Sequence, residues 1–109
     1  DTPGREPEIV TGMALAGAQC MAFSTGRGAL QGFPTMPVVK ICGNPNTYEH
    51  LINDMDINAG TIITGEKSVE EVGEELFAKL VRVLSGETCK GESIRYPKTM
   101  DIYTLGPII

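Results

Sequence analysis

Three apolar stretches predict the main elements in the first half of the chain. After Pro7, apolar and small residues recur every three or four positions as far as Gly17, which predicts a helix with one buried face. Residues 20–24 (Cys-Met-Ala-Phe-Ser) and 38–42 (Val-Val-Lys-Ile-Cys) are almost continuously apolar, as expected of short parallel strands buried on both faces. We expect the first of these two strands to lie in the centre of the sheet.

The second half of the chain predicts a short helix, a strand and a long helix. Thr47 is the candidate cap of the short helix, and residues 61–64 (Thr-Ile-Ile-Thr) have the composition of a third strand. Ser68 and Glu71 have the spacing of a capping box, and Gly86 ends the pattern of the long helix. The apolar positions near one face of that helix are Val69, Val72, Leu76, Leu80, Val83 and Leu84.

Strands alternating with helices predict an α/β domain. We expect a small three-layer fold with a short, mainly parallel sheet flanked by helices, Rossmann-like or flavodoxin-like. The chain has 109 residues, 41% of them hydrophobic, so residues 1–109 have material for a single core and no second domain. Residues 1–4 do not begin with Met and resemble the middle of a chain, which favours a fragment of a longer protein. The apolar residues of the segment 87–109 are expected to wrap the domain or to meet a partner.

Charge and cysteine content narrow the functional classes. With 14 acidic against 9 basic residues and no basic stripe, nucleic acid is not an expected partner. No apolar run approaches the roughly 20 residues of a membrane span and no signal peptide opens the chain, so we expect a cytoplasmic protein. The three cysteines, Cys20, Cys42 and Cys89, have no Cys-x-x-Cys spacing, which argues against disulfides and zinc. Cys20 and Cys42 lie inside apolar runs, which favours small buried hydrophobes.

The loop after the first predicted strand carries the strongest chemical signal. Ligands of open parallel sheets bind beyond the carboxyl ends of the strands. Arg27 stands there between Gly26 and Gly28, so backbone N–H groups and a guanidinium can together grip a carboxylate or phosphate. The alternative, weighted evenly, is that the glycines only form a tight turn and Arg27 is solvated. The glycine spacing matches neither a dinucleotide fingerprint nor a P-loop.

Other polar residues allow weaker hypotheses. Asp54 and Asp56 can ligate a hard cation or accept hydrogen bonds from a polyol, but two carboxylates offer too few ligands, so a turn at a helix end is favoured. His50, the only histidine, is expected at the surface rather than as a base. Lys40 interrupts an apolar strand and is expected to meet an acidic group or a ligand. A cluster of acidic residues is expected on the exposed side of the long helix: Glu70, Glu71, Glu74 and Glu75.

Several short segments form a recognisable pattern through their order and spacing: Asp1-Thr2-Pro3-Gly4, Phe23-Ser24-Thr25-Gly26-Arg27-Gly28, Lys40-Ile41, Asn44, Asp54-Met55-Asp56-Ile57-Asn58-Ala59-Gly60 and Ser85-Gly86-Glu87. Together they resemble the C-terminal part of the altronate and galactarate dehydratase family of sugar-acid hydro-lyases, which also contains sulfolactate sulfo-lyase large subunits. The resemblance runs from Asp1 to about Glu87, and more loosely to Ile109.

This resemblance implies elimination of water, or of sulfite in the sulfo-lyases, from a hydroxy acid, assisted by a divalent metal, typically iron. It also implies that a substantial N-terminal portion of the enzyme lies outside this chain. We expect that portion to supply the base and the metal ligands, and we expect no metal in this chain and little activity from it alone. The sequence departs from many relatives at Ala59, where a Cys often stands, which discourages a metal ligand there.

Within this chain the resemblance and the loop chemistry point to one set of substrate-binding residues. Thr25, Gly26, Arg27 and Gly28 are expected to hold the carboxylate of a sugar acid, and Asn44, Asp54 and Asn58 to lie near its hydroxyls or to order the loop. Catalytic residues cannot be assigned, and a homo-oligomer stays open. Two rival functions use the same loop: a regulatory module that senses an anion, and a purely structural interaction domain.

Overall fold

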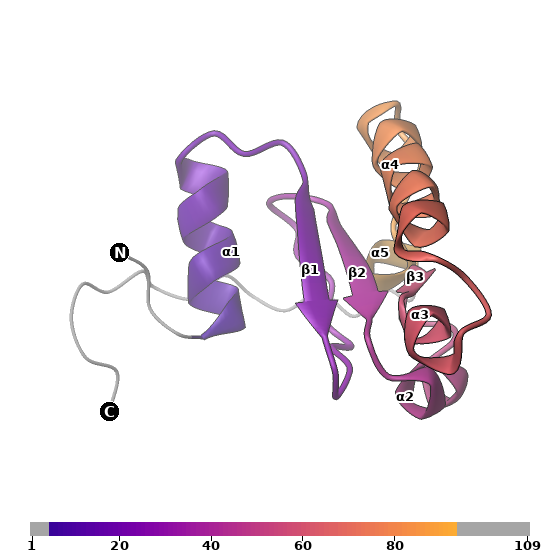
Figure 1. Ribbon diagram of the computed structural model, residues 1–109. Coiled ribbons are helices and arrows are strands. Elements are labelled where there is room, and N and C mark those ends of the chain that lie inside the picture. The colour runs from indigo at the N-terminus through magenta and orange to yellow at the C-terminus, as the bar shows by residue number, and fades with distance from the viewer. Residues whose placement is uncertain (1–4, 94–109) are drawn as a thin grey trace.

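A computed structural model describes residues 5–93 as a three-stranded sheet between helices (Figure 1). Its architecture confirms the predicted three-layer α/β class. In chain order the elements are α1 (Glu6–Leu15), β1 (Met21–Thr25), β2 (Val38–Cys42), α2 (Pro45–His50), β3 (Ile57–Asn58), α3 (Gly60–Thr64), α4 (Val69–Leu84) and α5 (Lys90–Ser93).

The sheet is parallel, with the strand order β1-β2-β3. The register runs from Met21 opposite Val38 to Thr25 opposite Cys42, and Ile41 lies opposite Ile57. The central strand is therefore β2, and the expectation that the first strand is central and buried on both faces was wrong. Within the described sheet β1 is an edge strand whose residues alternate between half-buried and exposed, since its outer side has no neighbouring strand in residues 5–93.

The third strand also differs from the prediction. Residues 61–64 form helix α3, and the two-residue strand β3 precedes them. Asn58 explains the change, because its Oδ1 accepts a hydrogen bond from the Gly60 amide (3.0 Å) and its carbonyl accepts one from Thr61 Oγ1 (2.9 Å). These local bonds turn the chain into a helix and override the strand preference of β-branched residues. Gly60 is needed for close packing, since a Cβ there would lie 2.5 Å from the nitrogen of Pro45.

Each face of the sheet has its own apolar cluster. Val10 of α1 packs with Phe33, Met36 and Val38 on one face, while Val39 and Ile57 pack with α4 on the other. The capping box of Ser68 and Glu71 is confirmed, and Gly86 adopts the left-handed conformation expected after a helix end (φ 106°). The predicted buried face of α4 is narrower than expected, because Val69 and Leu84 are 63% and 62% exposed. No helix in the described part of the chain is long and apolar enough to cross a membrane.

Candidate functional site

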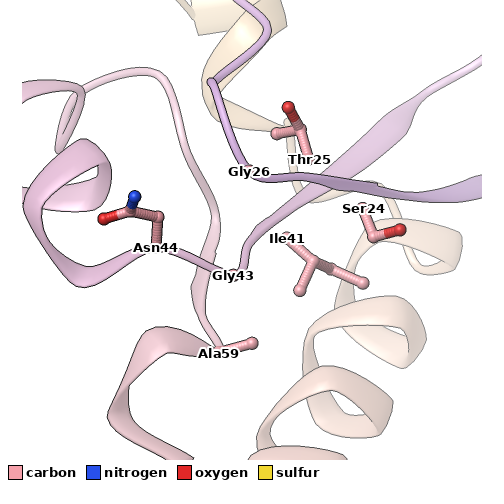
Figure 2. A pocket seen from close by; sticks show the side chains of 7 residues that line it. All are labelled: Ser24, Thr25, Gly26, Ile41, Gly43, Asn44 and Ala59. Carbon is pink, nitrogen blue, oxygen red and sulfur yellow. The ribbon is translucent and has the colours of Figure 1, made fainter. Parts of the chain in front are cut away.

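An open cleft lies at the carboxyl ends of β1 and β2, where the topology of parallel sheets places ligands (Figure 2). Its volume is about 360 Å3. The residues that line it come from both strand ends and from the start of α3: Ser24, Thr25, Gly26, Ile41, Gly43, Asn44 and Ala59. Thr25, Gly26 and Asn44, which were predicted from the sequence to bind substrate, therefore meet in one cleft.

The loop after β1 is held in place by its own side chains and by α2. Thr25 Oγ1 accepts a hydrogen bond from the Gly28 amide (3.0 Å), and Thr47 Oγ1 donates one to the Gly26 carbonyl (3.1 Å). Gly28 has φ 90°, and a Cβ on it would lie 2.2 Å from Leu51 Cδ1, so this position requires glycine. The Thr25 hydroxyl thus fixes the loop, while the backbone of Gly26 borders the cleft.

Several donors in and beside the cleft form no hydrogen bond within residues 5–93. These are the Ser24 hydroxyl, the Asn44 side-chain amide, and the backbone N–H groups of Gly26 and Arg27. The Asn44 oxygen is engaged, since it accepts from the amides of Asn46 (3.0 Å) and Thr47 (3.3 Å) and so caps α2. The cap predicted at Thr47 was therefore placed three residues too late. A neutral surface rich in unused donors is suited to a carboxylate or to hydroxyl groups.

The other predicted site residues occupy different positions. Arg27 directly follows the cleft residue Gly26; it is exposed and its guanidinium forms no ion pair within the described residues. Gly28 packs on Leu51 and does not line the cleft. Asn58 lies at the carboxyl end of β3, but its side chain starts α3. Asp54 lies in the turn before β3, outside the cleft lining.

The set of predicted substrate-binding residues lacked four residues that line the cleft: Ser24, Ile41, Gly43 and Ala59. The signal for Ile41 was the strand alternation, because Ser24 and Ile41 are paired in register and share one face. Ala59 had been noted only as the position where relatives often carry Cys. Its side chain gives this wall of the cleft a methyl group.

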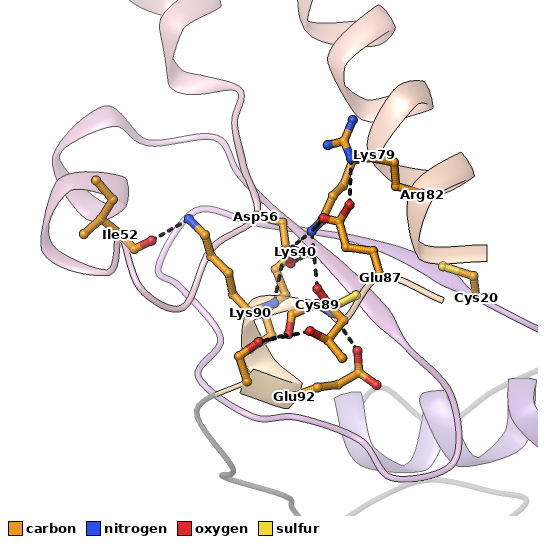
Figure 3. Close-up of polar contacts among 12 residues, drawn as sticks. Cys20, Lys40, Ile52, Asp56, Lys79, Arg82, Glu87, Cys89, Lys90 and Glu92 are labelled. Carbon is orange, nitrogen blue, oxygen red and sulfur yellow. Dashed lines mark hydrogen bonds and ion pairs between the residues drawn. The ribbon is translucent and has the colours of Figure 1, made fainter. Parts of the chain in front are cut away.

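Asp56 is the centre of a second polar region, buried between β2, α4 and α5 (Figure 3). Its side chain is 0% exposed. One carboxylate oxygen accepts from the Lys40 amide (3.0 Å), and the other accepts from the Lys90 amide (3.0 Å) and lies 3.5 Å from Lys79 Nζ. The carboxylate is therefore fully engaged inside the protein and is not available to a ligand.

The Asp56 carboxylate favours the protonated form of Lys79 and of the two nearby thiols, Cys89 and Cys20. Burial disfavours the charge of Lys79, but its 2.6 Å hydrogen bond with Glu87 and the attraction of Asp56 prevail and raise the pKa of Lys79. The same hydrogen bond lowers the pKa of Glu87. Burial, reinforced by Asp56, raises the pKa of Cys89 to about 12, and burial also raises the pKa of Cys20. Both thiols therefore stay protonated near neutral pH, which argues against a nucleophilic role. Cys42 is buried as predicted, whereas Cys20 is only half-buried.

Lys40 is the most buried charged residue of the sheet. It is 1% exposed, and its Nζ has no hydrogen-bond partner within residues 5–93. Burial lowers the pKa of Lys40, although Asp54 and Asp56 partly oppose the shift. The sequence led us to expect an acidic group or a ligand beside the Lys40 side chain. Asp56 lies nearby, but it accepts a hydrogen bond from the backbone of Lys40 and not from its ammonium group. His50 is exposed as predicted, with Nδ1 2.7 Å from the Asn46 carbonyl.

The cleft residues do not match the needs of an iron ion. Iron sites in proteins are built from imidazole, carboxylate or thiolate ligands, whereas this cleft presents hydroxyl, amide and backbone groups. Across residues 5–93 no group of three or more His, Cys, Asp or Glu side chains is placed to hold a metal. The described residues therefore do not form a metal site by themselves.

Comparison with known proteins identifies the family. A family model described as the C-terminal part of D-galactarate/altronate dehydratase matches residues 1–107. The chain belongs to the galactarate/altronate dehydratase family. It is 38% identical over 86 residues to galactarate dehydratase (L-threo-forming) of Escherichia coli strain K12, which covers 79% of this chain and 16% of that protein.

Two further members of the dehydratase family show its breadth. Altronate dehydratase of Bacillus subtilis strain 168 is 32% identical over 90 residues, covering 83% of this chain and 18% of the relative. The (2R)-sulfolactate sulfo-lyase subunit beta of Chromohalobacter salexigens is 30% identical over 94 residues, covering 86% and 24%. The resemblance seen in the sequence is thus confirmed, and the chain spans less than a quarter of the length of these relatives.

Proposed function

We propose that this chain is the C-terminal part of a longer lyase that eliminates water from a sugar acid, and that the cleft holds the substrate carboxylate. The observation that carries the proposal is the set of unused donors at the carboxyl ends of β1 and β2, beside the exposed Arg27. The free thiols of Cys20, Cys42 and Cys89 agree with a cytoplasmic location for this reaction.

Elimination beside a carboxylate needs three groups. A base takes the proton from the carbon next to the carboxylate, donors or cations stabilise the resulting enediolate, and an acid protonates the hydroxyl that leaves as water. In our proposal Gly26 and Arg27 supply the second function, within a loop fixed by Thr25 and Gly28. Asn44 contacts substrate hydroxyls, while Asn58 orders the start of α3 beside the cleft.

The remaining groups come from the rest of the polypeptide. The cleft lining contains no Asp, Glu, His or Lys side chain, so it offers neither a base nor an acid. We place the base, the acid and the divalent metal implied by the resemblance in the N-terminal portion of the complete enzyme.

Arg27→Lys in the complete enzyme tests the proposal. Lysine keeps the charge but loses the planar, bidentate grip on a carboxylate, so kcat/KM on the true sugar acid should fall by about tenfold or more. Stability should change little, because Arg27 is exposed and unpaired within the described residues. The matched control is Arg82→Lys on α4, where the ion pair with Glu87 survives the exchange. Wild-type kinetics for Arg27→Lys would remove this residue from the site.

The leaving group decides between two substrate classes. The sulfo-lyase relative matches 86% of the chain, so we keep sulfite elimination from a sulfolactate-type acid as the second candidate. Both classes share the carboxylate that the cleft would hold. Assaying the complete, iron-supplemented protein against aldonates, aldarates and sulfolactate, with water and sulfite release measured separately, distinguishes them.

A further inference from the structure

The apolar face of helix α4 is wider than the part of it that packs against the sheet. Its inner row (Val72, Leu76, Leu80 and Val83) packs into the core, but four further apolar side chains on this helix are 47–69% exposed: Val69, Phe77, Val81 and Leu84. Successive residues advance by 100°, so Leu84 and Phe77 lie about 40° and 60° beyond Leu80. Leu84, Phe77 and Val81 therefore continue the buried face round the helix, while Val69 extends the buried row at the N-terminal end of the helix.

The neighbouring face of β1 is uncovered as well. Ala22 and Ser24 pair in register with Val39 and Ile41, so they lie on the sheet face that α4 covers. Both are nevertheless exposed, because α4 packs over β2 and β3. Figure 2 shows the side chains of Ser24 and Ile41 on the same side of the strands, within the cleft lining.

The exposed arc of α4 turns toward this open part of the sheet. Leu76 and Leu80 pack against the same buried cluster as Cys20 and Ile41, and Phe77 lies further round the helix beyond Leu80. We define the β1–α4 face as the exposed residues Ala22, Ser24, Val69, Phe77, Val81 and Leu84. Exposed apolar side chains gathered on one side of a domain are typical of an interaction site.

We propose that the β1–α4 face binds the N-terminal portion of the same polypeptide. The family model describes a C-terminal part, and the relatives carry most of their length outside the matched region, since the match covers only 16–24% of them. A covalently linked portion has a far higher effective concentration than a second copy of the chain. Because the cleft adjoins this face, docking there also brings outside groups to a cleft that lacks a base. The inference rests on the proposed role of the chain as one part of a longer lyase.

A photoreactive side chain identifies the occupant directly. In the complete polypeptide, Phe77 is replaced by p-benzoylphenylalanine, an aromatic exchange at a position that is 69% exposed and so outside the core. Irradiation should cross-link it to a peptide that precedes Asp1, within a single polypeptide chain. The matched control places the same group at Ala78, an exposed residue about 100° round the helix, and should cross-link at least about tenfold less. Cross-links to residues 94–109 or to a second copy, or none in the folded protein, would overturn the proposal.

Thiol labelling gives an independent measurement. Phe77→Cys and Ala78→Cys both fall in the tryptic peptide 68–79, which contains no native cysteine, so labelling by a neutral maleimide can be read at each site by mass spectrometry. In the complete protein the thiol at position 77 should react at least about tenfold more slowly than the one at position 78. Equal rates would contradict docking. Neither readout uses activity, so a kinetically silent Arg27→Lys would sink the proposed function and leave this result standing.

Discussion

The cleft and the Asp56 cluster are both built from polar residues next to strand ends, yet they differ in how far their hydrogen-bonding capacity is used. Asp56 is fully buried, and both of its oxygens are engaged by α4, α5 and β2. Ser24 is exposed at the cleft, and its hydroxyl forms no hydrogen bond within residues 5–93. The Asp56 cluster holds β2, α4 and α5 together, whereas the cleft has hydrogen-bonding groups left for a ligand.

This difference shows which observation separates structural from functional polar residues. Asp54, Asp56 and Asn44 are equally polar in the sequence, and spacing alone gave Asp56 a possible ligand role. Burying a charge is favourable only when it is paired and hydrogen-bonded, so a saturated carboxylate in the interior is committed to the fold. An unused donor at the mouth of a sheet costs little because water satisfies it, and a substrate can replace that water.

The largest effect is expected from Asp56→Ala. Removing the carboxylate leaves the Lys79 ammonium without its most buried partner, and it leaves the amides of Lys40 and Lys90 without an acceptor. The free energy of unfolding should therefore fall by about 3–5 kcal/mol. Urea unfolding of the complete protein measures this. Asp54→Ala is the control, because the Asp54 side chain forms no hydrogen bond or ion pair within residues 5–93, and it should stay within about 0.5 kcal/mol. A similar loss for both variants would contradict the central role of Asp56.

Lys40→Met is expected to increase the stability of the protein, by less than Asp56→Ala decreases it. The variant removes a buried ammonium without a partner in the described residues and should be more stable at pH 7 by about 1–3 kcal/mol.

The gain from Lys40→Met should depend on pH in a defined direction. The folded-state pKa of Lys40 lies below the ordinary value of 10.5, so the cost of its charge is full below the folded pKa and falls as pH rises from there toward 10.5. The variant's advantage should therefore shrink in alkaline solution, as followed by urea unfolding between pH 7 and pH 11. A constant or growing advantage would show that Lys40 is not destabilised by burial.

The smallest effect on stability is expected from Gly26→Ala. This variant tests whether the cleft binds substrate. A Cβ at Gly26 would have no atom within 4 Å, so the free energy of unfolding should change by less than about 1 kcal/mol. If substrate approaches the Gly26 backbone, however, kcat/KM should fall by about tenfold. Gly60→Ala is the contrasting control, since its Cβ would clash with Pro45 and should cost stability. Unchanged turnover in Gly26→Ala would mean that the cleft does not bring substrate to this loop.

The sequence predicted the elements whose signals are local, and it failed where distant contacts decide. The Ser68–Glu71 capping box and the strand Val38–Cys42 were found because their residue types act within a few positions. Residues 61–64 were misassigned because Asn58 starts a helix through bonds that composition does not reveal. The edge position of β1 depends on which strand pairs with which, and an apolar run carries no such information.

The candidate site was predicted in part for the same reason. The position of Thr25, Gly26 and Asn44 follows from the general topology of parallel sheets, so their convergence could be foreseen. The engagement of Asp56 with Lys79 and with the Lys90 amide joins residues 23 and 34 positions apart along the chain, and no local pattern encodes it.

That long-range engagement of Asp56 has a consequence for biosynthesis. A nascent chain that has emerged only as far as β3 already contains the carboxylate but none of the α4 and α5 groups that neutralise it. Until those helices leave the ribosome, closing the sheet over Asp56 would bury an unpaired charge, so folding should wait for them. We therefore expect Asp56 to delay collapse of the half-made domain.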